Sequence, residues 1–248
     1  MRFFTYFFPL FFALISFSSE ENFKAAQNKY ERVRKAYSEK EASLKKLCKE
    51  KNINFSSQEI FLRAFKKEGQ LEVWSRTKGT SKYILLKSYP ICSSSGDLGP
   101  KRRQGDGQVP EGFYHIDRYN PSSSYYLSLG VNYPNASDKI LGGPRLGGDI
   151  FIHGSCVTIG CIPITDEMVK EVYVLFIEAK NSGQSKVPIH IFPCKLSEES
   201  FNSLKKEHSD NKAMVLFWGN LKPGYDYFEK NKVLPRITVE ANGKYKIS

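Results

Sequence analysis

The sequence contains few cysteines and none of the closely spaced cysteine pairs that mark a structural metal site. Five of its 248 residues are cysteine. This number is too small for a dense disulfide framework, and because it is odd, at least one thiol has no partner within the chain. A structural zinc site usually draws its four ligands from paired cysteines or histidines. No internal repeat is apparent either. The cysteines lie at positions 48, 92, 156, 161 and 194.

No long basic run is present, although the formal net charge is +11. Lysines and arginines are spread along the chain, and the densest cluster is Lys101-Arg102-Arg103. Without a basic stripe or a nucleic-acid motif, the sequence does not predict binding to DNA or RNA. A basic protein outside the cell membrane would instead meet anionic lipid or an anionic cell wall.

Only the N-terminus has a long apolar run. Residues 1–19 carry one charge, Arg2, then an apolar stretch and small residues, which predicts a cleaved export signal. The alternative is a membrane anchor, but Pro9 interrupts the stretch and a span needs about 20 apolar residues. No other segment could cross a membrane. We therefore expect a periplasmic or extracytoplasmic protein that is peripheral to the membrane at most.

A helical arm is predicted for residues 20–68. Apolar residues recur every three or four positions between 22 and 51, which indicates one long amphipathic helix. Ser56 and Glu59 fit a capping box, so a second short helix is expected over residues 60–65. The arm could pack on the main domain, or it could serve dimerisation or reach toward the cell wall. The short apolar seam favours packing.

Residues 69–194 form the predicted catalytic domain, and residues 195–248 form an extension. Short β-branched and aromatic runs from residue 71 onward predict a mainly β fold, a mostly antiparallel sandwich or open barrel. One internal helix is expected from an N-cap at Thr165 to a stop at Gly183. In the α/β extension we expect a helix after Ser197 and another with Pro223 in its first turn. A final hairpin should turn through a type I′ Asn242-Gly243.

The stretch "HGSCVTIGC" runs from His153 to Cys161 and concentrates the chemistry-bearing residues. His153 ends an apolar strand, and Gly160 directly precedes Cys161. Such an arrangement fits a thiol nucleophile with an imidazole base, while the backbone N–H groups of Gly160 and Cys161 could bind an oxyanion. Two alternatives stay open from the residues alone. These are a metal site, which lacks its ligand pattern, and a structural pair of buried thiols beside a core histidine.

The same stretch resembles the signature of the L,D-transpeptidase catalytic domain, also called the YkuD-like domain. His153-Gly154 and Thr158-Ile159-Gly160-Cys161 match that signature, although Ile159 replaces a second histidine and the intervening loop is short. These departures are similar to the YafK branch of the family, whose pattern reads "HGxCVSIGC". The runs "GPKRRQGDGQVPEGFYHIDRYNP" and "FWGNLKPGYDYFEK" also resemble that branch. The resemblance spans about residues 60–235.

That resemblance implies roles for individual residues. Cys161 would be the nucleophile and His153 the general base, while the Thr158 hydroxyl or a nearby carbonyl would orient the imidazole. Gly154 would shape the site. The implied substrate is the stem peptide of peptidoglycan, which Cys161 would attack at the carbonyl of the L-centre of diaminopimelate.

The resemblance implies neither a cofactor nor a metal. Water would resolve the thioester in an enzyme that releases a wall-linked protein, whereas an amine would resolve it in a cross-linking transpeptidase. The short loop, and the resemblance of this chain to a branch that contains an amidase, favour water. A non-catalytic protein that binds the cell wall is the alternative from another class.

Weaker signals concern the loop before the predicted strand at 112–119. Arg102, Arg103 and Asp106 are candidates for binding the substrate, although solvated loop charges are the simpler interpretation. The glycine-rich segment 104–112 fits a functional loop and a turn at the edge of a sheet equally well. Among the other cysteines, Cys156 is expected to be a packed small residue. Cys92 and Cys194 could pair, which would leave Cys161 free.

The apolar N-terminus generates a first testable expectation. The mature protein should begin near Ser19 or Glu20, because cleavage follows the small residues at the end of an export signal. N-terminal sequencing of the protein recovered from outside the inner membrane checks this. Recovery of mature soluble protein that still carries residues 1–18 would contradict it.

Overall fold

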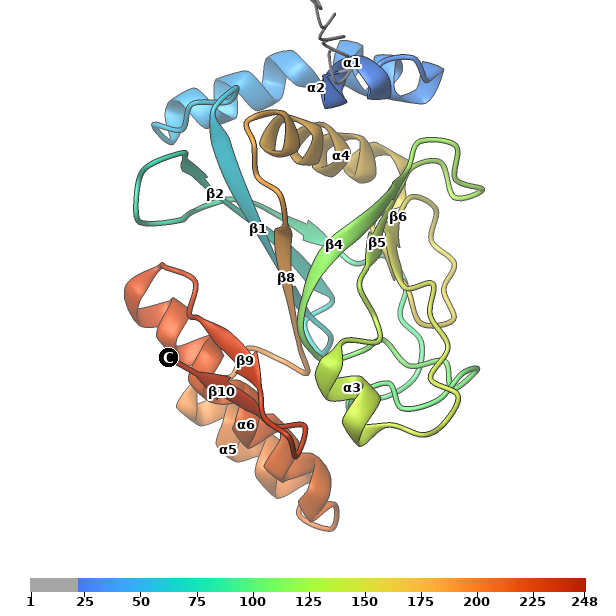
Figure 1. Cartoon of the computed structure of the whole chain (residues 1–248), viewed down its shortest axis with the longest axis vertical. Coiled ribbons are helices and arrows are strands. Elements are labelled where there is room, and N and C mark those ends of the chain that lie inside the picture. The colour runs from blue at the N-terminus through green and yellow to red at the C-terminus, as the bar shows by residue number, and fades with distance from the viewer. Residues whose placement is uncertain (1–21) are drawn as a thin grey trace, which may run out of the picture.

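An eight-stranded curled mixed sheet organises the computed structural model, which describes residues 22–248 (Figure 1). The predicted export signal, residues 1–19, lies outside the described residues. The strand order is β3-β2-β1-β8-β4-β5-β6-β7, and all neighbours are antiparallel except β1/β8 and β6/β7. The mainly β, mostly antiparallel prediction is confirmed. The strands are β1 Gln58–Phe65, β2 Gln70–Thr77, β3 Ile84–Pro90, β4 Gly112–Asn120, β5 Ser128–Val131, β6 Phe151–His153, β7 Ile162–Pro163 and β8 Val187–Phe192.

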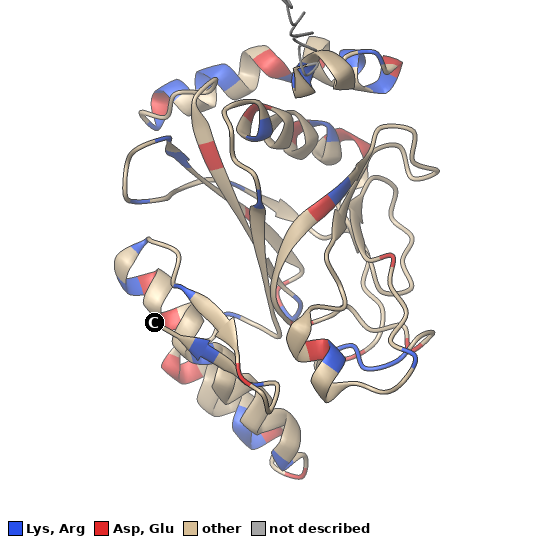
Figure 2. Ribbon diagram, viewed as in Figure 1, with Lys and Arg blue, Asp and Glu red and all other residues tan. Residues whose placement is uncertain are grey.

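Helices cover the sheet at two places. In Figure 1, α1 and α2 lie along α4 at one end of the sheet, and the C-terminal elements lie toward the other end. Lys or Arg and Asp or Glu alternate on α2 and on α5–α6, so neither part presents a purely basic face (Figure 2). No helix within residues 22–248 is long and apolar enough to cross a membrane. The helices are α1 Phe23–Gln27, α2 Glu31–Glu50, α3 Ala136–Leu141, α4 Thr165–Asn181, α5 Glu198–Glu207 and α6 Lys212–Asn231, and β9 Ile237–Val239 pairs with β10 Tyr245–Ile247.

The predicted helix over residues 60–65 is wrong, because these residues belong to β1. Seven of the eight β1 residues are buried, so the strand shows no alternation between apolar and polar positions. Ile60 and Leu62 join the core shared with α4, whereas Phe61 packs against Phe228 of α6 with ring centroids 4.9 Å apart. A strand covered on both faces reads as a continuous apolar run, which periodicity cannot distinguish from a buried helix.

The N-terminal arm packs on the main domain, which is the alternative that the sequence favoured. Its predicted single helix is divided into α1 and α2 by a break at residues 28–30. The Tyr37 hydroxyl donates to Glu178 Oε1 of α4 at 2.7 Å, and Val33 and Ala36 are fully buried in the main core. An apolar seam that is used up by intramolecular contacts is not available to pair with a second chain.

The predicted limits of α4 are right to within one residue. The helix begins at Thr165, so Ile164 and not Thr165 is its N-cap residue, although the Met168 N–H donates to Thr165 Oγ1 at 3.4 Å. At the other end Gly183 has φ +97°, and the Gln184 N–H reaches back to the Ala179 carbonyl at 3.0 Å. Glycine in this left-handed conformation is the usual way to end a helix.

Two details of the extension differ from the prediction. Pro223 lies inside α6 instead of in its first turn, because the helix already begins at Lys212. The final hairpin is confirmed, but its turn is not type I′, since only Gly243 of the turn has positive φ, at +82°. The Gly243 N–H donates to the Glu240 carbonyl at 2.9 Å. This is the three-residue loop with a left-handed glycine instead of the two-residue turn.

A buried ion pair joins the extension to the sheet. Arg63 of β1 is 3% exposed and donates to Glu72 Oε2 of β2 at 2.7 Å and to Glu229 Oε1 of α6 at 2.6 Å. Its guanidinium also lies 4.9 Å from the ring of Trp74 and 4.8 Å from that of Phe228. Removing the cation would leave the Glu72 carboxylate buried without its counter-charge, which is costly.

Arg63→Met should therefore destabilise the protein strongly, by about 3–5 kcal/mol in urea unfolding, because a buried carboxylate loses its partner. Arg76→Met provides a matched control on the adjacent strand. Arg76 pairs with Glu59 at 2.6 Å and stacks on Tyr83, but both partners of the ion pair are about one-fifth exposed. Its loss should cost roughly 1 kcal/mol or less. Equal losses in the two variants would contradict the assignment of Arg63 as the anchor.

Candidate active site

His153 ends β6, and Cys161 directly precedes the adjacent strand β7 on the same face of the sheet. Strands β6 and β7 are parallel, with Ile152 opposite Ile162 and His153 opposite Pro163. Because side chains alternate along a strand, the fully or almost fully buried Ile152 and Ile162 point to one face. His153 points to the other, and Cys161, one residue before Ile162, shares the face of His153.

The imidazole of His153 is fixed in a neutral, proton-accepting form. The side chain is 2% exposed, packs beside Tyr125 with ring centroids 4.7 Å apart, and has Nδ1 2.5 Å from the Gly154 carbonyl. Since a carbonyl can only accept, Nδ1 carries the proton and Nε2 keeps its lone pair. Burial lowers the pKa of His153 below its usual value, although the Gly154 carbonyl acts in the opposite direction. The ring is therefore neutral near pH 7.

The surroundings of Cys161 favour the protonated thiol near neutral pH. Burial raises the pKa of Cys161, and the backbone N–H of Phe151 only partly offsets this rise. The thiol donates to the Asp149 carbonyl with an Sγ–O distance of 3.4 Å. Although His153 and Cys161 are both described, no hydrogen bond joins their side chains. Such bonds often form only in the substrate complex, so the two side chains remain candidates for nucleophile and base.

The sequence analysis proposed that either the Thr158 hydroxyl or a nearby carbonyl orients the imidazole of His153. The first version is wrong, because Thr158 does not hold the imidazole. Its hydroxyl donates to the Cys161 carbonyl at 2.9 Å and accepts from the N–H groups of Gly160, at 3.1 Å, and Cys161, at 2.8 Å. The Gly154 carbonyl orients His153, which agrees with the other form of the prediction. The two N–H groups predicted to bind an oxyanion are thus occupied, and Thr158 must release them before they can do so.

Glycine is required at both predicted positions. A Cβ on Gly154 would lie 2.4 Å from Asp166 Oδ1 and 2.9 Å from the Tyr125 carbonyl, distances that real Cβ atoms do not show. Gly160 has φ +132°, and a Cβ there would lie 3.0 Å from the Gln108 carbonyl. Asp166, which the sequence analysis did not single out, accepts from the Ser155 N–H at 2.8 Å. The first turn of α4 therefore holds the loop that follows His153.

A disulfide joins Cys92 to Cys156, with Cα atoms 5.5 Å apart. The expectation that Cys156 is simply a packed small residue is wrong, because it forms this disulfide. The considered pairing of Cys92 with Cys194 is also wrong, since Cys194 is a buried free thiol. The disulfide connects the loop between His153 and Cys161 to the segment after β3. Sequence spacing could not reveal this because 64 positions separate the two cysteines. Cys161 is free, as expected.

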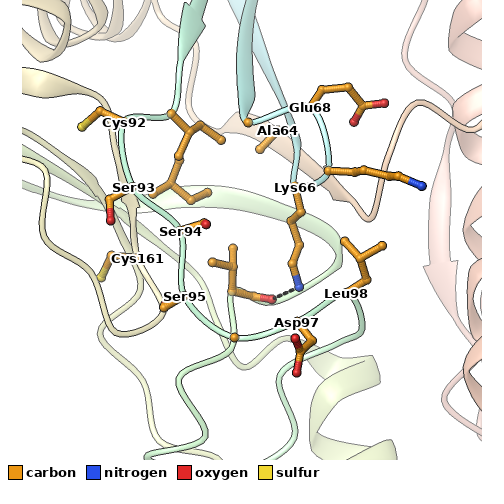
Figure 3. A pocket seen from close by; sticks show the side chains of 16 residues that line it. Ala64, Lys66, Glu68, Cys92, Ser93, Ser94, Ser95, Asp97, Leu98 and Cys161 are labelled. Carbon is orange, nitrogen blue, oxygen red and sulfur yellow. Dashed lines mark hydrogen bonds between the residues drawn. The ribbon is translucent and has the colours of Figure 1, made fainter.

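Cys161 opens onto a cavity of about 540 Å³ (Figure 3). Part of the lining is the segment after β3, which carries a run of three serines, and Cys161 and Ile162 also line the cavity. Lys66 also lines the cavity, but its ammonium already contacts the carbonyls of Gly99 and Val109 and the carboxylate of Glu111. His153 does not line this cavity. The serines, at 93, 94 and 95, supply hydroxyl groups that sequence reasoning missed.

The three weaker substrate-binding candidates do not line the cavity beside Cys161. Arg102 pairs with Asp138 at 2.9 Å and lines a different, more apolar groove, and Arg103 lines a third. Asp106 accepts hydrogen bonds from Lys101 and from the N–H groups of Arg102, Arg103 and Gln108. Burial would raise the pKa of Asp106, but these donors together lower it. Asp106 therefore organises the loop instead of facing a ligand.

No cluster of three or more His, Cys, Asp or Glu side chains suited to a metal ion occurs within residues 22–248. The arrangement places a histidine at the end of β6 and a cysteine directly before the adjacent β7, with the cysteine on the wall of a cavity. A free thiol and a neutral imidazole on one face of a sheet make this a candidate site for thiol chemistry.

The comparisons identify the family. The sequence pattern of the L,D-transpeptidase catalytic domain, YkuD, matches residues 60–188. Over 191 residues, which cover 76% of this chain and 74% of the relative, the sequence is 39% identical to YafK of Escherichia coli K12. The chain belongs to the L,D-transpeptidase catalytic domain family.

Two solved structures align with most of the chain. The helical cell shape determining protein Pgp2 from Campylobacter jejuni is 20% identical, with a TM-score of 0.45 over 74% of this chain and 73% of that one. Bd1075 from Bdellovibrio bacteriovorus is 17% identical, with a TM-score of 0.40 over 73% and 76%.

The raised pKa of Cys161 predicts how the thiol reacts in the absence of substrate. Alkylation by iodoacetamide should be slow at pH 7 and should rise about tenfold per pH unit toward pH 9, because the rate follows the thiolate fraction. Mass spectrometry of the labelled peptide separates Cys161 from the buried Cys48 and Cys194. A rate that is already constant at neutral pH would show that a thiolate is present at rest, contrary to the geometry.

Proposed function

We propose that this protein is an exported cysteine acyl-transfer enzyme that acts on the stem peptides of peptidoglycan. The observation that carries the proposal is the shared face of His153 and Cys161, one with a free Nε2 and the other on a cavity wall. Membership of the L,D-transpeptidase family supports a peptidoglycan-related transpeptidase function. YafK, whose provisional name is that of an L,D-transpeptidase, supports the same class of chemistry.

The reaction follows from the two neutral side chains. When a substrate fills the cavity, the Cys161 thiol turns from the Asp149 carbonyl and gives its proton to Nε2 of His153. The sulfur then attacks the carbonyl carbon at the L-centre of diaminopimelate, and the carbonyl oxygen takes the negative charge. As the intermediate collapses, the imidazolium returns the proton to the departing amine, and a thioester remains on Cys161. Water or a second amine releases the acyl group.

Water is the acceptor that we favour. The loop between Gly154 and Gly160 is short, and Ile159 at its tip is 87% exposed and cannot form a side-chain hydrogen bond. An amine acceptor outcompetes water only when it is held in line with the thioester, and the loop offers few groups to hold it. The enzyme would then release a group linked to the wall, for example a protein. Cross-linking is the second candidate, which the family name favours.

The site of action is proposed to be outside the inner membrane. Residues 1–19 have the pattern of an export signal, and peptidoglycan, the proposed substrate, lies in that compartment. The Cys92–Cys156 disulfide agrees with an oxidising compartment, where such bonds persist.

The decisive experiment uses purified protein with a diaminopimelate-containing tetrapeptide muropeptide and, separately, with a peptide-linked muropeptide. Mass spectrometry should detect free tripeptide and released peptide. Accumulation of cross-linked dimers without tripeptide would replace hydrolysis by transpeptidation. Cys161→Ala must abolish either reaction. If the parent protein binds muropeptides but never converts them, a non-catalytic wall-binding function takes the place of the enzyme.

His153 should be required in its neutral form. His153→Ala should lower kcat by about 10²–10⁴-fold, the usual contribution of a positioned general base. In the parent, activity should fall as the pH drops through the lowered pKa of His153, below its usual value of about 6.5, because protonation removes the lone pair. Full activity in His153→Ala would show that another residue acts as the general base. His190 cannot be that base at the same site, since it lies on β8 between the rings of Phe61 and Phe113.

A further inference from the structure

Arg118, a residue with no assigned role, lies in the same cross-strand row as the nucleophile. Arg118 of β4 is opposite Gly130 of β5, and Gly130 is opposite Phe151 of β6. Because β7 runs parallel to β6 with Ile152 opposite Ile162, Cys161 continues the row beside Phe151. Side chains in one row share a face of the sheet, so Arg118 and Cys161 approach Phe151 from opposite sides.

Gly130 leaves the space through which Arg118 reaches Phe151. The Arg118 guanidinium lies 4.9 Å from the Phe151 ring centroid. A Cβ on Gly130 would lie 2.8 Å from Arg118 Cβ, 2.9 Å from Arg118 Nε and 3.0 Å from Phe151 Cε1. Gly130 does not have a positive φ, so its backbone could accept any residue. Glycine is needed at position 130 because the Arg118 side chain passes over it to reach Phe151.

The same guanidinium fixes Asp149, two residues before Phe151. Arg118 Nη1 donates to Asp149 Oδ1 at 2.9 Å, Nη2 donates to the Val131 carbonyl at 3.1 Å, and Nε donates to Asp117 Oδ1 at 3.0 Å. Asp149 has φ +57°, a left-handed conformation that costs a non-glycine residue energy. The ion pair holds the side chain of a residue whose backbone is strained.

Both ends of this segment act on the sulfur of Cys161. The Asp149 carbonyl accepts the thiol proton at 3.4 Å, and the backbone N–H of Phe151 lowers the pKa of the thiol. Arg118 therefore contacts the two residues whose backbone groups act on the nucleophile, without itself forming a hydrogen bond to it. An ion pair this exposed contributes little to stability, so its placement calls for another explanation.

We propose that Arg118 is a positioning residue for Cys161, which holds the segment Asp149–Phe151 against the sulfur and balances the carboxylate beside it. This inference rests on the proposed function, in which Cys161 is the nucleophile. Without Arg118, the Asp149 charge would be uncompensated and the Phe151 N–H would lose its fixed direction. Both changes disfavour the thiolate.

Other charged or titratable groups near Cys161 remain unchanged in the test. Lys101 acts on the thiol through its charge, and His153 shares its face of the sheet. The groups that line the shared cavity are Lys66, Lys67, Glu68 and Asp97.

The test compares Arg118→Met with Arg76→Met, because Arg76 also combines an ion pair with an aromatic contact but lies on β2, away from Cys161. The first readout is the pH dependence of Cys161 alkylation, and the second is the pair of constants kcat and KM with a muropeptide. In Arg118→Met the apparent pKa of Cys161 should rise by about half a unit to one unit, as expected for an uncompensated nearby charge. The kcat should fall about tenfold with KM within about twofold, since nucleophile position is altered and substrate contacts are not.

Arg76→Met should match the parent in both readouts. Two further variants guard against a trivial loss of folding, which thermal unfolding monitors. Gly130→Ala keeps the arginine but blocks its path and should shift alkylation in the same direction, and Arg118→Lys should give an intermediate effect. Alkylation profiles and kcat values for Arg118→Met equal to those of Arg76→Met would overturn the proposal. Alkylation needs no peptide, so it decides the role of Arg118 even if no muropeptide is converted.

Discussion

The register between β6 and β7 is the constraint on which the candidate site depends. Only two residue pairs define it, Ile152 with Ile162 and His153 with Pro163. A slip of one residue would turn Cys161 toward the core and separate it from the face of His153. Burial of Ile152 and Ile162 opposes such a slip, and the Ile164 N–H bonds the His153 carbonyl at 2.9 Å. An apolar contact on one face thus sets the chemistry on the other.

Three contacts hold the loop between His153 and Cys161, two from other parts of the fold and one from within the loop. Asp166 binds it from α4, the disulfide ties Cys156 to the segment after β3, and Thr158 closes it internally. In this arrangement the Cys161 thiol donates to a carbonyl, and the N–H groups of Gly160 and Cys161 are already bonded to Thr158. If the proposed function is right, substrate binding has to exchange these hydrogen bonds for new ones, and its binding energy would activate the thiol.

The C-terminal extension is connected to the same cavity through a buried carboxylate of the loop before β4. Glu111 is fully buried and accepts from Trp218 Nε1 of α6 at 2.7 Å and from the Gly99 N–H at 2.7 Å. It also pairs with Lys66, which lines the cavity beside Cys161. Because a buried carboxylate needs all of its donors, the extension, the loop before β4 and the cavity wall are ordered together. The extension is therefore part of the structure that shapes the site.

Local pattern was enough to predict the elements whose signals are complete within a short window. The short strands, the limits of α4 and the final hairpin follow from alternation, capping and turn residues. The stretch from His153 to Cys161 contains the candidate site residues, and its resemblance indicated the family that the comparisons establish.

The predictions that were wrong concerned residues whose environment is set by partners far away in the sequence. Residues 58–65 were predicted to be partly helical because the strand is covered on both faces, by α4 and α6, and so lacks alternation. Cys156 and Cys92 are 64 positions apart, and only the fold brings them together. Arg118 had no signal at all, since its role requires Gly130 and Phe151 in one row across three strands. The sequence by itself determined which residues carry chemistry, because side-chain type is local. Tertiary structure alone decided which of them meet, because register and packing join residues that the chain keeps apart.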